Sequence, residues 1–182
     1  RTLDDVDVKG KRVLLRVEES GGRIGADELV ERMRRLAHVF RTEFVFGVED
    51  PATLSFEEPI RHFAEERLLV REGDEYVIAP GAREPIRFFA EVLAPLVESY
   101  RIVSRVLNAD EAPVVEKEVV KACLRTGRKL LSLEEIKHSE AISVVCFRNA
   151  LSVLRASVAS GRTPDLKAAA KALEEVLGRE PG

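Results

Sequence analysis

"EPIRFFAEVLAPLVESYRIVSRVL", residues 84–107, decides the fold because it holds the strongest helical periodicity in the chain. Apolar side chains recur there at alternating steps of three and four, which places them on one helix face: Ile86, Phe89, Leu93, Leu96, Tyr100, Val103 and Leu107. One long helix is the simplest prediction. Pro95 lies inside it, so we expect a kink there and a released carbonyl one turn earlier, near Glu91.

The residues after this stretch predict helices alone. The first starts at Pro113 and carries Val115, Val119, Ala122, Thr126 and Leu130 at helical spacing. The second lies within 138–160 and has an unbroken apolar stripe of Val144, Phe147, Leu151, Leu154 and Val158. The last, "TPDLKAAAKALEEVLG" (163–178), has Thr163 as N-cap, Pro164 at its first position and Gly178 beyond its end.

The residues before the stretch 84–107 predict both helices and strands. "KGKRVLLRV" (9–17) predicts a strand, and a helix from Ala26 carries Leu29, Met33, Leu36 and Phe40 on one face. Ser55, with Glu58 three positions on, predicts an N-cap and its capping-box partner for a short helix bearing Ile60 and Phe63. "RLLVREGDEYVIAP" (67–80) then predicts a hairpin around Gly-Asp. Helix, helix, hairpin is the order of a winged-helix unit.

We therefore predict a mainly α fold, with a small winged-helix-like α/β hairpin unit in the first half and a helical bundle in the second. The expected divisions are an N-terminal strand-like segment (1–25), a winged-helix-like unit with the long helix (26–110) and a helical C-terminal subdomain (111–182). The stretch "NADEAP" (108–113) is the expected boundary between the last two.

Charge excludes a global attraction to nucleic acid or to anionic lipid. The 182 residues hold 29 basic and 32 acidic side chains, a net charge of −3, so any such binding has to be local. No uncharged apolar run reaches the length of a membrane-spanning helix, and the N-terminus has no signal-peptide core. The chain begins at Arg1, which indicates a fragment, a processed form or an incomplete gene model.

The stretch "HSEAISVVCFRNAL" (138–151) gathers reactive residue types, yet its apolar stripe indicates a packing helix. A nucleophile needs a base within hydrogen-bond reach, and Cys146 lies eight residues from His138, about 12 Å along a straight helix. Cys146 and Asn149 flank the stripe. The polar residues expected to face away from it are Ser143, Arg148, Ser152 and Arg155, and Ser143 and Arg148 are expected to tolerate substitution.

The other candidate residues point to no site either, and we predict no catalytic, cofactor-binding or metal-ligating residue. Cys123 and Cys146 lack the spacing of a zinc knuckle, a CxxC motif or a disulfide framework, which favours reduced, buried thiols. His38 lies off the apolar stripe of its helix, and His62 among glutamates lacks an HExxH partner and is expected to pair with Glu58. No phosphate loop or GxSxG motif is present in the sequence.

The winged-helix order raises the question of DNA binding. The helix that would enter a groove, 55–67, carries Glu57, Glu58, Glu65 and Glu66 against Arg61 and Arg67. Binding to DNA phosphates requires an excess of positive charge on this helix, and here negative charge is in excess. We therefore expect no nucleic-acid partner, and interpret this unit as a packing or protein-interaction module.

Four stretches resemble, in order, the region downstream of the catalytic domain in membrane-associated glycerol-3-phosphate acyltransferases. They are "LAHVFRTEFVF" (36–46), "EYVIAP" (75–80), "RFFAEVLAPLVESYRIVSRVL" (87–107) and "EAISVVCFRNALSVL" (140–154). The resemblance covers about residues 26–160. It implies a parent enzyme that transfers an acyl chain to the sn-1 hydroxyl of glycerol 3-phosphate in phospholipid biosynthesis.

That family uses an HxxxxD motif, which this sequence lacks: the residues five positions after His38, His62 and His138 are Glu43, Arg67 and Ser143. The resemblance therefore implies a non-catalytic C-terminal domain with a structural or regulatory role. Its partner would be an upstream acyltransferase domain, and the parent protein would lie in the cytoplasm, peripherally at the inner membrane. No metal, cofactor or nucleic acid is implied.

The first stretch, "RTLDDVDVKGKRVLLRV" (1–17), separately resembles the N-terminal strand of phosphoglycerate kinase. The chain departs from that family at Glu18, Glu19 and Ser20, and it has no glycine-rich nucleotide loop. Two alternatives to the acyltransferase interpretation thus stay open. One is a stand-alone winged-helix-like interaction module, and the other is a vestigial kinase fragment.

Overall fold

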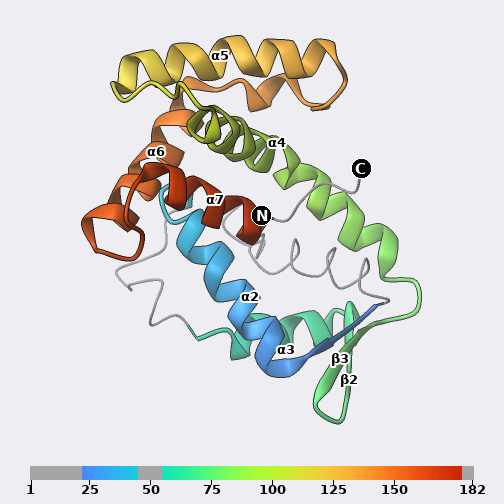
Figure 1. Cartoon of the computed structure of the whole chain (residues 1–182). Coiled ribbons are helices and arrows are strands. Elements are labelled where there is room, and N and C mark those ends of the chain that lie inside the picture. Colours follow the sequence, from blue (N-terminus) through green and yellow to red (C-terminus); the bar gives the residue numbers. More distant parts are fainter. Residues whose placement is uncertain (1–21, 45–54, 178–182) are drawn as a thin grey trace. The chain divides into compact units, whose positions relative to one another are not determined.

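The computed structural model describes residues 22–44 and 55–177, so the strand expected at 9–17 and the expected cap Gly178 lie outside the described residues. The fold is mainly α, with a small antiparallel sheet in the first half and helices in the second, as predicted (Figure 1). The described residues form two compact units. The first contains 22–38 and 55–93, and the second contains 39–44 and 94–177.

In the first unit, helix α2 (Ala26–Val39) forms where the sequence predicts it. Asp27 and Glu28 in its first turn interact favourably with the positive end of the helix dipole. Leu29 and Met33 from the predicted stripe are 0% and 1% exposed, and Leu36 is also buried. The period of the apolar residues therefore identified the inward face of this helix.

Helix α3 (Glu57–Glu65) begins one residue later than predicted. Phe56, not Ser55, is the N-cap, and its carbonyl accepts the hydrogen bond from the Ile60 N–H at 3.0 Å. The Ser55 hydroxyl accepts a long hydrogen bond from the Glu57 N–H at 3.4 Å and none from Glu58, so the expected capping box with Glu58 is wrong. The physical reason is burial: the Phe56 ring is 4% exposed, and removing it from water outweighs a side-chain cap.

The hairpin is confirmed, with β2 (Leu69–Glu72) and β3 (Glu75–Ile78) joined by Gly73 and Asp74. Gly73 has φ +63, a conformation that glycine adopts at no steric cost. A third strand, β1 (Arg23–Gly25), pairs with β3 and gives the order β1-β3-β2. The sequence did not predict β1, because three residues carry too short a pattern to recognise.

Helix α4 (Arg83–Asn108) confirms the prediction made from the decisive stretch. Ile86, Leu93, Tyr100, Val103 and Leu107 of its stripe are buried, and Leu96 is half-buried. Val97, Ile102 and Val106 are buried as well, so the part in the second unit is enclosed on most sides. The side chain of Phe89 lies outside the described part of the chain, and the kink at Pro95 stays a prediction.

Helix α5 (Glu116–Ser132) starts three residues after Pro113, so the predicted start is wrong. Val115 is its extended N-cap, and Glu116 and Glu118 follow where negative charge favours a helix start. Val119 and Leu130 are buried as expected, Ala122 and Thr126 are half-buried, and Val115 is exposed. A Cβ on Gly127 would lie 3.2 Å from side-chain atoms of Ile102 and Ile142, so glycine permits close packing there.

Helices α6 (Val144–Ala159) and α7 (Leu166–Leu177) complete the second unit, and α6 contacts both α5 and α7. Phe147, Leu151 and Leu154 of the α6 stripe are buried, while Val144 and Val158 at its ends are half-buried. Asp165, not Thr163, caps α7 by accepting from the Ala168 N–H at 2.8 Å. A carboxylate is at least as good an N-cap as a threonine hydroxyl, and Asp165 directly precedes the helix.

The buried stripe of α6 makes a prediction about stability. Leu151→Ala should lower the free energy of unfolding by about 2–5 kcal/mol, because the residue is 1% exposed and its removal leaves a cavity. Arg148→Ala, at an exposed position, should lower it by no more than about 0.5 kcal/mol. Urea titrations measure both. A harmless Leu151→Ala beside a damaging Arg148→Ala would show that the helix faces the other way.

Candidate functional site

The three histidines lie in different surroundings. His38 is half-buried on α2, His62 is exposed on α3, and His138 is half-buried in the connection after α5. The first two belong to the first unit and His138 to the second. Among the residues that the structure describes, no group of three or more His, Cys, Asp and Glu side chains is placed to hold a metal ion.

The solvent face of α3 is acidic, as the sequence indicated. Glu57, Glu58, Glu65 and Glu66 are all exposed. The Arg61 guanidinium lies 3.7 Å from Glu58 and 3.8 Å from Glu65, so Glu58 pairs with Arg61 rather than with His62 as expected. A guanidinium is charged at every accessible pH, which makes it a better partner for a carboxylate than an exposed imidazole.

The reactive-looking stretch 138–151 is divided between a connection and the start of α6, not a single helix. Ser143 is the N-cap of α6, and its hydroxyl accepts from the Cys146 N–H at 3.3 Å. The expectation that Ser143 tolerates substitution is therefore corrected, because losing such a cap costs about 1 kcal/mol. Arg148 and Ser152 are exposed as expected, whereas Arg155 is half-buried and pairs with Glu116.

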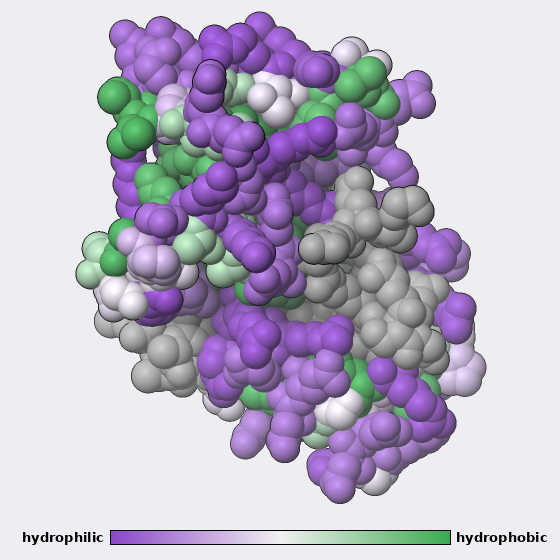
Figure 2. Space-filling model, in the orientation of Figure 1, coloured by the Kyte–Doolittle hydropathy of each residue, from purple (hydrophilic) through white to green (hydrophobic). Residues whose placement is uncertain are grey.

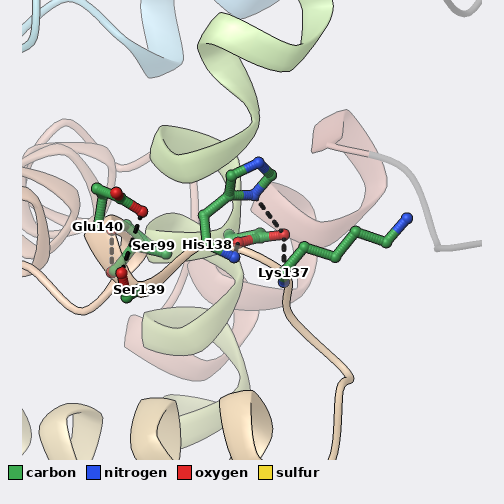
Figure 3. Close-up of polar contacts among 7 residues, drawn as sticks. Ser99, Lys137, His138, Ser139 and Glu140 are labelled. Atoms are coloured by element: carbon green, nitrogen blue, oxygen red, sulfur yellow. Dashed lines mark hydrogen bonds and ion pairs between the residues drawn. The ribbon is translucent and has the colours of Figure 1, made fainter.

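A buried carboxylate forms the most elaborate polar arrangement in the second unit (Figure 3). Glu98, on α4, is 7% exposed. Its two oxygens accept hydrogen bonds from the backbone N–H groups of Lys137 and His138, at 3.0 and 3.1 Å. These bonds, each to a charged acceptor, replace the water that the carboxylate loses on burial. Glu98 thus holds the connection between α5 and α6 against α4.

The imidazole of His138 stands beside the same carboxylate. Its Nδ1 lies 3.1 Å from Oε1 of Glu98. A dashed line in Figure 3 marks this contact at the labelled His138 ring. The contact has the distance of an ion pair but not the direction of a hydrogen bond, and Nδ1 is buried without another partner. A carboxylate beside a histidine resembles the orienting half of a catalytic triad, so its neighbours decide its role.

The neighbouring hydroxyls are already engaged. Ser99, fully buried on α4, donates to the carbonyl of Ala141, and Ser104 donates to the carbonyl of Ala170 on α7 at 2.6 Å. Ser139 donates to the carboxylate of Glu140 at 3.3 Å on the surface. A nucleophilic hydroxyl has to donate to a base, and these donate to carbonyls or to an exposed acid. These hydrogen bonds tie α4 to the segments that follow it in the chain.

Glu98, Ser99 and Ser104 are the buried polar residues among those described, and all three lie on α4. Each one bonds to backbone groups of a segment that follows α4 in the chain. We call them the α4 polar set. Sequence reasoning missed the set because it considered only the one apolar stripe of α4. The available signal was the apolar residues outside the stripe, Val97, Ile102 and Val106, which lie on different sides of α4 and indicate that this part of the helix is enclosed.

Tyr100 joins α4 to the segment that follows α2, within the second unit. Its hydroxyl donates to Glu43 at 3.0 Å and lies 3.3 Å from the Thr42 hydroxyl, and its ring packs edge-on against Phe40 at 5.0 Å. Burial raises the pKa of the Tyr100 hydroxyl well above its ordinary value. Tyr100 therefore remains a hydrogen-bond donor at any physiological pH.

Both cysteines are free, as predicted, but the expectation that both are buried is correct for Cys123 alone. Cys123 on α5 is completely buried, and Cys146 on α6 is half-buried. Burial raises the pKa of the Cys123 thiol to about 12. Because the thiolate is the reactive form, Cys123 is chemically inert in the folded protein.

The comparisons with known proteins agree with one another. A family model described as "Glycerol-3-phosphate acyltransferase C-terminal region" matches residues 12–159. The dihydroxyacetone phosphate acyltransferase of Mus musculus is 27% identical over 151 residues, which cover 79% of this chain and 22% of the mouse protein. The chain therefore spans less than a quarter of the length of that relative. No solved structure matches the chain.

The bonds of Glu98 can be tested by substitution. Glu98→Ala should lower the free energy of unfolding by about 2–4 kcal/mol, because two partly buried N–H groups lose their acceptor. Glu135→Ala, which breaks an exposed pair with Arg105, should cost less than about 1 kcal/mol. Amide hydrogen exchange should accelerate at Lys137 and His138 in the first variant alone. Equal effects of the two substitutions would contradict the assignment.

The two thiols should differ in reactivity. With Ellman's reagent at mildly alkaline pH, the native protein should react at Cys146 and leave Cys123 unmodified until denaturant is added. The single variants Cys123→Ala and Cys146→Ala identify which thiol reacts. Because the folded pKa of Cys123 is raised, its contribution to stability is complete below about pH 8.5 and is lost as the pH rises toward about 12. Rapid native labelling of Cys123 would refute its burial.

Proposed function

Because this chain belongs to the family of glycerol-3-phosphate acyltransferase C-terminal regions, we propose that it is the non-catalytic C-terminal part of such an enzyme. In the parent reaction an acyl chain would be transferred to the sn-1 hydroxyl of glycerol 3-phosphate, an early step of phospholipid biosynthesis. The observation that carries the proposal is the match over residues 12–159 in a sequence without an HxxxxD motif. The catalytic groups would then lie in another part of the parent protein.

The hydrogen bonds of the α4 polar set support a structural role. The buried carboxylate and the two buried hydroxyls are all bonded to backbone groups, which leaves them unavailable for proton transfer to a substrate. They hold α4 to the connection after α5 and to α7 instead. A region of this kind would support or regulate the acyltransferase domain by presenting a stable surface to it.

Two related molecules are candidates for the acceptor substrate of the parent enzyme. The family description names glycerol 3-phosphate, while the mouse relative is named for dihydroxyacetone phosphate. Both are three-carbon phosphates with a free hydroxyl, and the product in either case carries a long acyl chain. A product of that kind partitions into membranes, so we place the parent enzyme peripherally at a membrane. No described helix is long and apolar enough to cross one.

One observation favours a second role for the first unit. Its strands and helices follow the order β1, α2, α3, β2, β3, and the exposed face of α3 is acidic. Such a winged-helix-like unit would bind a basic protein surface more readily than a nucleic acid. This interaction role is compatible with the acyltransferase assignment, because the partner would be the basic surface of the enzyme's own catalytic part.

A chimaera tests the proposed function. The purified 182-residue chain should acylate neither glycerol 3-phosphate nor dihydroxyacetone phosphate. Mouse dihydroxyacetone phosphate acyltransferase truncated before the matching region should lose activity, and residues 12–159 fused in its place should restore part of it. The same fusion with Leu151→Ala should restore less, because its C-terminal region is destabilised. Turnover by the isolated chain, or full activity of the truncated enzyme, would overturn the proposal.

A further inference from the structure

The solvent face of α5 carries a concentration of positive charge that the net charge of −3 conceals. We define the basic face of α5 as its exposed cationic side chains: Lys117, Lys121, Arg125, Arg128 and Lys129. At 100° per residue these positions fall within a sector of about 120° on the helix. The row from Lys117 to Lys129 extends about 18 Å along the helix axis.

The basic face of α5 points to solvent because the opposite face of the helix is buried. Val119, Val120, Cys123, Gly127 and Leu130 are buried. Gly127 packs so closely against Ile102 and Ile142 that rotation of α5 about its axis would displace these contacts. The packing of α5 therefore places the five cations on one side of the helix, with Glu118 among them.

The positive charge of this face is mostly uncompensated. Lys121 pairs with Glu118 at 2.9 Å, whereas the other four cations form no salt bridge with any residue that the structure describes. Hydrogen bonding to Lys121 lowers the pKa of the Glu118 carboxyl, and the charges of Lys117 and Arg125 lower it further. The remaining acid of α5, Glu116, is already paired with Arg155 and lies 3.9 Å from Arg148.

Exposed apolar residues stand at both ends of α5. Val114 and Val115, just before the helix, are 80% and 64% exposed, and Leu133, just after it, is 55% exposed. Figure 2 shows a hydrophilic surface along α5 with hydrophobic surface near each end. Apolar side chains beside a row of cations are the composition of surfaces that bind at the membrane interface, where the cations meet headgroups and the apolar groups enter below them.

We propose that the basic face of α5 docks on an anionic lipid bilayer, with Val114, Val115 and Leu133 entering the headgroup region. Charge complementarity favours an anionic occupant, and the exposed apolar ends favour a bilayer over DNA, whose phosphates offer them no apolar contact. Glu134 and Glu135 follow Leu133, so the contact is strongest toward the start of α5. The inference rests on α5 alone and stands whether or not the chain supports an acyltransferase.

Vesicle sedimentation with the intact chain tests the inference. The protein should sediment with phosphatidylcholine vesicles that contain about one-third phosphatidylserine, and not with pure phosphatidylcholine. Raising NaCl to about 0.5 M, where screening reduces the Debye length to a few Å, should release it. The double variant Lys121→Glu with Arg125→Glu should bind at least about tenfold more weakly, since each basic residue near the surface strengthens binding roughly fivefold.

A matched control separates the basic face from the net charge. Arg61→Glu with Arg67→Glu changes the charge of the chain by the same amount at exposed positions of the first unit, and it should bind like the unmodified protein. Circular dichroism melts should show that both double variants are folded. Equal weakening by the two variants, equal binding to neutral vesicles, or binding to duplex DNA as tight as to the anionic vesicles would each overturn the proposal.

Discussion

The carboxylate of Glu98 sits in the most enclosed part of α4, and a charge there is stable only if its lost hydration is replaced. The replacement comes from the backbone N–H groups of Lys137 and His138, which are about forty residues away in the chain. The two hydrogen bonds of the buried Glu98 carboxylate therefore determine the path of the connection between α5 and α6. Ser99 and Ser104 repeat the arrangement with the carbonyls of Ala141 and Ala170, so α4 organises the second unit by polar contacts as well as apolar ones.

The hydrogen bonds of α4 bear on function because they engage its buried polar groups and leave the exposed cations of α5 free of any packing role. The buried polar side chains of α4, Glu98, Ser99 and Ser104, are bonded to backbone groups, and Cys123 is buried as a neutral thiol. The chain belongs to the family of glycerol-3-phosphate acyltransferase C-terminal regions. The outer face of α5 is the contrasting feature, because five cations there are exposed and are not required by the packing of the helix.

The helix boundaries show where local sequence rules stop applying. Ser55, Pro113 and Thr163 all have the right chemistry to start a helix, and each helix begins a little later in the chain. The energy of a good cap is about 1 kcal/mol, which is less than the gain from burying a ring such as that of Phe56. At α3, packing therefore decides between neighbouring start positions, whereas α7 begins after the better-placed cap Asp165.

By itself the sequence determined the mainly α class, the faces on which α2, α4 and α6 pack, the hairpin, the family and the absence of the catalytic motif. These follow from periodicity, turn residues and motif spacing, which are properties of short stretches of chain. The tertiary structure alone decided that Glu98, Ser99 and Ser104 lie inside, that β1 joins the sheet, and that Ser143 and Asp165 cap their helices. Each of these depends on a partner distant in the sequence or on competition between neighbouring positions, and the burial of a polar residue is settled only by the groups that surround it.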